Sequence, residues 1–251
     1  AIAIGIELRI TQFVVLFSNP RVPILGTIVH TITFPLIAIG MLGIIAYFQI
    51  GLDDYLILGI LLVAACPSGG FSNLLVLMAK ADLALSVTLT SVSSVLSFIT
   101  VPFFFWIFSK LMPDVSGSVE LPIVATLVQL IGLVIFPVGV GMLWRHLQPE
   151  FVIPNIARFQ KIMQIVLYVV LVIMLFQDQD NFLNGVGPAL PWSFALCVIS
   201  LSCGYGFARL VGLTQTEAAT VAIESSIRNL AVAFLIATSV LGRLDVAVLP
   251  G

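Results

Sequence analysis

The chain has 251 residues, of which 60% are hydrophobic and only 9% are charged, against about 25% charged residues in soluble domains. This composition, with a mean hydropathy of +1.20, predicts an all-α integral membrane protein and excludes a soluble domain. A net charge of −2 without any basic run argues against a nucleic-acid partner.

Several stretches reach the length of about 20 apolar residues that crosses a bilayer. We expect membrane spans over residues 22–47, 55–79, 83–109, 121–144, 155–176, 191–208 and 216–241. The chain opens on an apolar run without an initiating Met and stops as another apolar run begins. We therefore expect a truncated helix at each end.

Charges in the loops between these stretches alternate in sign, as the positive-inside rule requires. The basic side, predicted to be cytoplasmic, carries Arg9, Arg21, Lys80, Arg145, Arg158, Lys161 and Arg209. The opposite side carries Asp53, Asp54, Asp114, Glu120, Asp178, Asp180 and Asp245, with Lys110 and Arg243 as basic exceptions.

Two of the spans are interrupted near their middle by polar residues, over 67–73 and 224–229. An unpaired backbone group costs several kcal/mol in hydrocarbon, so an opened helix is tolerated only where it is buried in protein or lines a polar cavity. On the predicted topology the two spans run in opposite directions, and Asn73-Leu74-Leu75-Val76 resembles Asn229-Leu230-Ala231-Val232. Such a pair is typical of inverted-repeat transporters, although a simple kink is the alternative for each break.

The residues around the first break resemble the sodium/bile acid symporter family. The resemblance is carried by Cys66-Pro67-Ser68-Gly69-Gly70-Phe71-Ser72-Asn73 and by Ala84-Leu85-Ser86 with Thr90-Ser91-Val92-Ser93 on the next helix. The later Glu224, Arg228 and Asn229 are similar to the family's Glu-x-x-x-Gln-Asn, with one change. The resemblance implies a ten-helix plan of two inverted five-helix repeats. It also implies a panel domain (1–20 and 121–176) that rocks against a core domain (22–112 and 190–251) containing both broken helices.

A sodium site is predicted from the residues themselves. Hard cations prefer oxygen ligands, and these are supplied by Ser72, Asn73, Ser86, Thr90 and Glu224. Ser86 and Thr90 are four residues apart and share a helix face. By resemblance, the five residues match the first sodium site of the family. The alternative for the two hydroxyls is ordinary packing between membrane helices, worth about 0.6 kcal/mol per hydrogen bond.

Glu224 is an intramembrane carboxylate, which is costly and indicates a functional site. The alternative is a structural ion pair with Arg228, one helical turn away.

The chain departs from the family at its second sodium site, where Arg228 and His30 stand in place of two Gln residues. A guanidinium stays charged at any biological pH and repels a nearby Na⁺, so we expect no second sodium. Arg228 then acts as a tethered cation or grips an anionic substrate, or else His30 and Glu224 carry a proton. Taken alone, His30 is better explained as a hydrogen-bonded helix-packing residue.

We predict a secondary active transporter that couples one Na⁺ to an organic carboxylate, either bile-acid-like or smaller, by alternating access. Helix N-termini favour anions and Arg matches carboxylate geometry, so the expected substrate ligands are Asn73, Asn229 and Arg228. The expected partners are this anion, Na⁺ and the lipid bilayer, the expected location is a bacterial inner membrane, and no cofactor besides the coupling ion is expected.

Other functions are weighed against this one. They are a proton-coupled or uncoupled anion transporter, a non-transporting sensor on the same scaffold, and an arsenite exporter using Cys66. The spacing of Cys66, Cys197 and Cys203 matches no zinc or thioredoxin pattern. An enzyme is disfavoured because His146 is predicted to lie in a cytoplasmic loop and His30 has no evident Ser or Asp partner in its own span.

Overall fold

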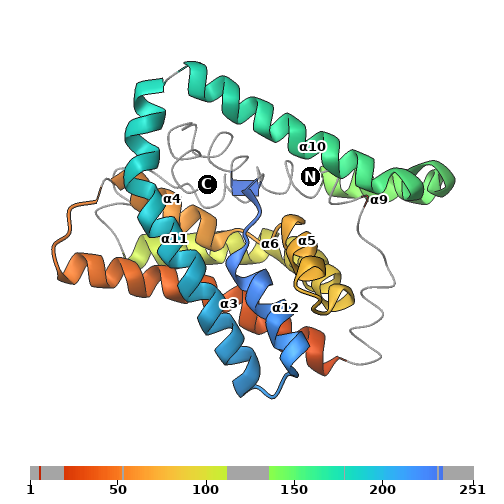
Figure 1. The fold of residues 1–251 in the computed structure, drawn as a ribbon, viewed down its shortest axis with the longest axis horizontal. Coiled ribbons are helices and arrows are strands. Elements are labelled where there is room, and N and C mark those ends of the chain that lie inside the picture. The colour runs from red at the N-terminus through yellow and green to blue at the C-terminus, as the bar shows by residue number, and fades with distance from the viewer. Residues whose placement is uncertain are drawn as a thin grey trace.

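The computed structural model describes residues 6, 20–52, 54–111, 136–177, 179–230 and 232–233. Within these ranges all regular structure is helical (Figure 1). The helices are α3 (Arg21–Tyr47), α4 (Asp54–Ala65), α5 (Phe71–Met78), α6 (Leu83–Leu111), α9 (Phe136–Leu147), α10 (Pro149–Gln177), α11 (Gln179–Leu210) and α12 (Gln215–Ser226). By length and composition, Arg21–Tyr47 and Ala189–Leu210 are able to cross a membrane, and the bent α6 adds a third. The prediction of an all-α membrane protein agrees with these helices at this coarse level.

Some predicted features fall outside the described ranges. They are most of the N-terminal panel segment 1–20, residues 121–135 of the fourth span, residues 234–241 of the last span, and the loop charges Arg9, Asp53, Asp114, Glu120, Asp178, Arg243 and Asp245.

Both predicted helix breaks are confirmed, with shifted boundaries. The first covers 66–70, so Ser72 and Asn73 already belong to α5. Pro67 explains it, because proline has no N–H and disfavours helical conformation in the preceding residue. The second begins only at Ile227, whose φ of −105° and ψ of 111° are extended.

The second break contains neither Pro nor Gly, and its helix ends on two serines. The Ser225 hydroxyl donates to the Val221 carbonyl at 2.7 Å and the Ser226 hydroxyl to the Ile223 carbonyl at 3.0 Å. Such bonds compete with the backbone ladder and favour bending. Glu224 therefore stays in the last turn of α12 while Arg228 lies beyond it.

The two breaks cross each other. The Asn229 N–H donates to the Pro67 carbonyl at 2.9 Å, and Ser68 and Arg228 form an antiparallel bridge. Each interrupted helix thus supplies hydrogen-bond partners that the other has lost, which is the condition for irregular backbone inside a membrane.

Helix α6 has a bend that the sequence analysis did not predict. Its segments Leu83–Ser97 and Ile99–Phe108 meet at 62°. Pro102 lies inside the helix, and its ring clashes with the carbonyl four residues earlier, at Phe98. The bend therefore has a local cause.

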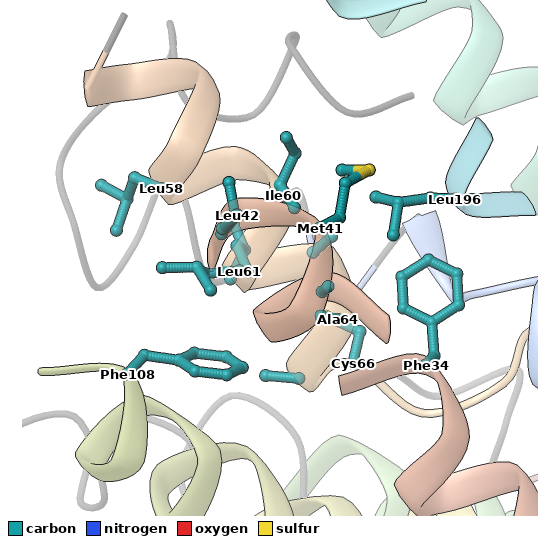
Figure 2. Close-up of a cluster of buried hydrophobic side chains, with 14 of the residues drawn as sticks. Phe34, Met41, Leu42, Leu58, Ile60, Leu61, Ala64, Cys66, Phe108 and Leu196 are labelled. Atoms are coloured by element: carbon teal, nitrogen blue, oxygen red, sulfur yellow. The ribbon is translucent and has the colours of Figure 1, made fainter. Parts of the chain in front are cut away.

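Two apolar clusters enclose a polar layer. The first, drawn in part in Figure 2, gathers buried side chains of α3, α4 and α6, including Phe34, Met41, Leu61 and Phe108. The second joins α3, α6, α11 and α12 through Val29, Leu85, Leu89, Ala208, Leu213, Ala218 and Val221. Buried polar side chains lie between the two clusters. On α3 they are His30 and Thr33, and on α6 they are the Ser and Thr residues between Thr90 and Ser97. The polar layer thus lies at mid-helix, where burial demands hydrogen-bond partners.

Helices α9 and α10 lie along one edge of the molecule in Figure 1, apart from the crossing. Helix α10 packs against α9 and against α11, which leads back to the crossing. The two helices fall within or next to the predicted panel segment 121–176, and relative movement of panel and core stays a prediction.

Candidate functional site

A fully buried carboxylate lies at the centre of the polar layer. Glu224 has 0% of its surface exposed. Its Oε1 accepts hydrogen bonds from the hydroxyls of Ser72 and Ser86, both at 2.6 Å, and its Oε2 accepts from the Thr90 hydroxyl at 3.0 Å. Hydrogen bonds to a charged acceptor of this kind are short and strong.

Asn73 completes the cluster from the side of α5. Its Oδ1 is 2.6 Å from the Ser86 hydroxyl and 3.5 Å from that of Thr90. The structure therefore brings together all five residues that the sequence analysis proposed as sodium ligands. We call this group, Ser72, Asn73, Ser86, Thr90 and Glu224, the carboxylate cluster.

Local hydrogen bonds hold α5, α6 and α12 so that these side chains lie close together. Ser72 lies in the first turn of α5, where its backbone N–H donates to the Gly69 carbonyl and its hydroxyl oxygen lies 2.7 Å from the same carbonyl oxygen. Asp82 caps α6 by accepting from the Leu85 N–H at 3.0 Å. The Asp82 N–H in turn donates to the Thr220 hydroxyl at 2.9 Å, which ties the start of α6 to α12.

The carboxylate cluster offers only oxygen atoms, and one of its groups carries a negative charge when ionised. Each hydroxyl has two lone pairs and rotates to present them, so the hydroxyls that now donate to Glu224 are able to turn toward a cation. Among the described residues no group of three His, Cys, Asp or Glu side chains comes together. The donor set therefore suits a hard monovalent cation rather than a transition metal.

Arg228 lies on the other side of the crossing and forms a second group of contacts. Its Nη1 donates to the Cys66 carbonyl and its Nη2 to the His30 carbonyl, each at 3.1 Å. The guanidinium carbon lies 4.6 Å from the ring centre of Phe34, a cation–π geometry. Nε is buried and has no hydrogen-bond partner. We call Arg228, the two carbonyls and Phe34 the guanidinium cluster.

The structure contradicts a helical ion pair between Glu224 and Arg228. That pairing requires a continuous helix through Arg228, whereas α12 ends at Ser226. The carboxylate is bonded to hydroxyls and the guanidinium to backbone carbonyls. Each charge is compensated separately.

His30 meets Arg228 through its backbone and not through its ring. The side chain is fully buried, its Nε2 is 3.4 Å from the Thr31 hydroxyl, and its Nδ1 has no hydrogen-bond partner. Both predicted second-site residues therefore lie at one place, but the imidazole adds no contact to the guanidinium.

Asn229 has a structural contact of its own. Its Oδ1 accepts from the Val232 N–H at 3.2 Å and so caps the segment that follows the second break. Its predicted role in substrate binding stays a prediction.

Sequence reasoning missed two features of the crossing. A Cβ atom on Gly69 would lie 3.1 Å from the Arg228 carbonyl oxygen and from the Asn229 Cα, so this glycine permits the two backbones to approach. The aromatic partner Phe34 was also missed. The Gly-Gly pair was a signal for the first, and the four-residue spacing from His30 to Phe34 was a weak signal for the second.

Comparison with known proteins agrees with these features. Residues 1–184 match the model of the Sodium Bile acid symporter family. The chain is 25% identical over 240 residues to a Bacillus subtilis protein named "Uncharacterized sodium-dependent transporter YocS", covering 94% of this chain and 70% of that protein.

Two human proteins are also similar. The ileal sodium/bile acid cotransporter is 31% identical over 175 residues, which cover 68% of this chain and 48% of that protein. Sodium/bile acid cotransporter 4 is 28% identical over 204 residues, covering 76% of this chain and 44% of that protein. The aligned part is thus about half the length of these cotransporters. The chain belongs to the sodium bile acid symporter family, a family of sodium-coupled membrane transporters.

Proposed function

We propose that the protein is a secondary active transporter that moves one Na⁺ together with an organic carboxylate by alternating access. The observation that supports this most strongly is the convergence of Ser72, Ser86 and Thr90 on the buried carboxylate of Glu224. A buried carboxylate surrounded by hydroxyl and amide oxygens attracts a hard cation, and the printed names of the relatives include sodium-dependent transport.

The one-sodium stoichiometry is supported by the guanidinium cluster. Backbone carbonyl oxygens are common ligands of hard cations, and at this crossing two of them already accept from Arg228. A second Na⁺ would have to displace a permanent cation or lie next to it in a site of low dielectric. Arg228 thus acts as a tethered cation.

The substrate class rests on the crossing as well. The N-terminus of α5 opens at the crossing, and helix N-termini favour anions, so Asn73 and Asn229 are the proposed substrate contacts. Arg228 is less suited to grip a carboxylate in this state, because two of its five N–H donors are bonded to backbone carbonyls and Nε is buried. The proposed substrate is a monovalent carboxylate, bile-acid-like or smaller, and the proposed location is a bacterial inner membrane that the chain crosses several times.

Proteoliposome uptake tests this function. Radiolabelled cholate, pantoate and pyruvate are offered under a Na⁺ gradient, a pH gradient or neither, with arsenite as the competing cargo. We expect uptake of at least one carboxylate that requires Na⁺, with a Hill coefficient near one, because a single coupling ion gives no cooperativity with itself. Uptake driven by the pH gradient alone, or transport of arsenite only, would refute the proposal.

A variant series separates the two roles of Arg228. Arg228→Gln with His30→Gln removes the charge that repels a cation and supplies two amide oxygens, so the Hill coefficient for Na⁺ should rise above one. If Arg228 instead grips the substrate, Arg228→Gln alone should weaken anion affinity and leave the sodium titration unchanged. Clear cooperativity between two Na⁺ in the unmodified protein would contradict the one-sodium stoichiometry.

A further inference from the structure

The polar layer contains one acidic and one basic residue among the described side chains, Glu224 and Arg228. Every other described Asp, Glu, Lys or Arg lies at a helix end, in a turn, or on α9 or α10. The charge carried by the centre is therefore set by these two side chains and by whatever binds between the broken helices.

The two charges are balanced although they do not touch. The three hydroxyls of Ser72, Ser86 and Thr90 stabilise Glu224 in its ionised form, and with Glu224 ionised its charge cancels that of the permanently protonated Arg228. The His30 ring counts as neutral, because its buried Nδ1 has no hydrogen-bond partner and an imidazolium near the guanidinium would be an uncompensated charge. The empty centre thus has a net charge of zero.

Binding of Na⁺ and of a carboxylate changes the net charge of the centre in opposite directions, so each ligand favours the binding of the other. Na⁺ alone leaves the centre at plus one, and a monovalent carboxylate alone leaves it at minus one. Either state is a net charge in a low-dielectric interior, which is costly. Both ligands together restore zero, so the fully loaded centre and the empty centre carry the same net charge.

We propose that Arg228 is the fixed counter-charge of the transport cycle: it keeps the centre neutral when empty and when loaded with one Na⁺ and one carboxylate, so that neither translocating step depends on membrane potential. This inference rests on the proposed function. If a translocating step instead moved one net charge across the whole membrane, a potential of 100 mV would shift the equilibrium of that step between its inward-facing and outward-facing states by about fiftyfold.

The test measures uptake in proteoliposomes under a potential set by a K⁺ gradient and valinomycin. The probes are ²²Na⁺ and whichever of labelled cholate, pantoate and pyruvate the unmodified protein takes up. We expect a flux ratio of one Na⁺ per carboxylate and initial rates that agree within about twofold with and without the potential. A two-to-one ratio, or accumulation that rises by tenfold or more, would overturn the proposal while leaving sodium-coupled transport intact. Absence of sodium-dependent uptake, by contrast, would contradict the proposed function itself.

Arg228→Gln supplies the matched contrast. Without the fixed charge at least one translocating step carries charge, so the initial rate should change with potential. If the variant gains a second Na⁺, only the empty centre carries charge and an inside-negative potential should speed its return; with one Na⁺ the rate should fall where the loaded step limits uptake and rise where the empty step does. A rate that stays independent of potential would refute the counter-charge role.

Arg158→Gln is the control, because this exposed residue of α10 has the same charge outside the polar layer. Its uptake should remain insensitive to potential. If Arg228→Gln fails to fold, as judged by size-exclusion chromatography, the flux ratio and potential dependence of the unmodified protein still decide the question.

Discussion

The two sides of the helix crossing each stabilise a charged side chain inside the protein, but they do so with different groups. On one side, the carboxylate of Glu224 is surrounded by side-chain hydroxyls, one of which also contacts the Asn73 amide oxygen. On the other, the positive charge of Arg228 is surrounded by two backbone carbonyls and an aromatic ring. Hydroxyls are able to reverse their hydrogen bonds when a cation arrives, whereas backbone carbonyls of a fixed crossing accept from a cation that never leaves. The carboxylate cluster is therefore suited to binding and releasing a cation, whereas the guanidinium cluster contains a cation that is part of the chain.

The largest effect is expected from Glu224→Gln, which removes the charge of the carboxylate cluster and keeps its shape. Loss of one partner of a buried charged pair costs about 2–5 kcal/mol, so Na⁺ affinity should fall by about a hundredfold or more and coupled uptake should be lost. Binding of ²²Na⁺ to the purified protein measures this directly.

Glu217→Gln is the control for that variant, since Glu217 lies in the exposed first turn of the same helix. Its sodium titration should match the unmodified protein. Retained sodium dependence in Glu224→Gln would remove the carboxylate from the sodium site.

Gly69→Ala tests whether both sides depend on the close approach of the two breaks. The added methyl would meet backbone atoms of Arg228 and Asn229 at 3.1 Å, and backbone yields less readily than a side chain. Overpacking of this kind costs about 1–3 kcal/mol, so we expect a lower thermal unfolding temperature in detergent together with weaker Na⁺ binding. Gly40→Ala in α3, where a Cβ meets nothing within 4 Å, should not lower the unfolding temperature and should leave Na⁺ binding unchanged.

Thr90→Val sharpens the role of the hydroxyls. The substitution keeps the shape of the side chain and removes the oxygen that lies 3.0 Å from Glu224 Oε2. One hydrogen-bonding group is worth about 1 kcal/mol, so the Na⁺ concentration for half-maximal uptake should rise by about fivefold. Thr88→Val on the same helix loses only a bond to the Ala84 carbonyl and should not shift the titration. Equal titrations for both variants would return Thr90 to a packing role.

The smallest effect is expected at Thr214, far from either cluster. Thr214 and Glu217 form a capping box at the start of α12, and Thr214→Ala should lower stability by about 1 kcal/mol without changing Na⁺ affinity. A change in sodium affinity would mean that the end of α12 is coupled to the carboxylate cluster along the helix.

Much of the carboxylate cluster was predictable from the sequence because its members carry local signals. Ser86 and Thr90 share a helix face by spacing alone, and Glu224 is conspicuous as an acid in an apolar stretch. The presence of both breaks was equally predictable. Their limits were not, because Ile227 is apolar and β-branched like Ile223 inside the helix, and the helix ends there at the hydroxyl bonds of Ser225 and Ser226.

The partners of Arg228 had no comparable signal. The alternative of an ion pair with Glu224 at helical spacing was wrong, because α12 ends before Arg228. The actual acceptors are the carbonyls of Cys66 and His30, and every residue has such a group, so composition cannot single them out. The bend of α6 was missed for a different reason: Pro102 is visible in the sequence, but Pro also occurs in membrane helices without breaking them.

The hydrogen bonds of the crossing join two segments that are synthesised at different times. Cys66 and Arg228 are separated by 162 residues, which a ribosome needs roughly 10–30 s to add. During that interval the first broken helix has been made, while the segment of the second break that bonds to its backbone has not. Bare backbone groups are costly in lipid, so the first half of the chain has to be kept from the hydrocarbon core, beside the insertion machinery or at the interface, until its counterpart emerges. A ribosome that stalls before residue 229 therefore leaves a chain whose first break has no partner, which makes it a natural substrate for membrane quality control.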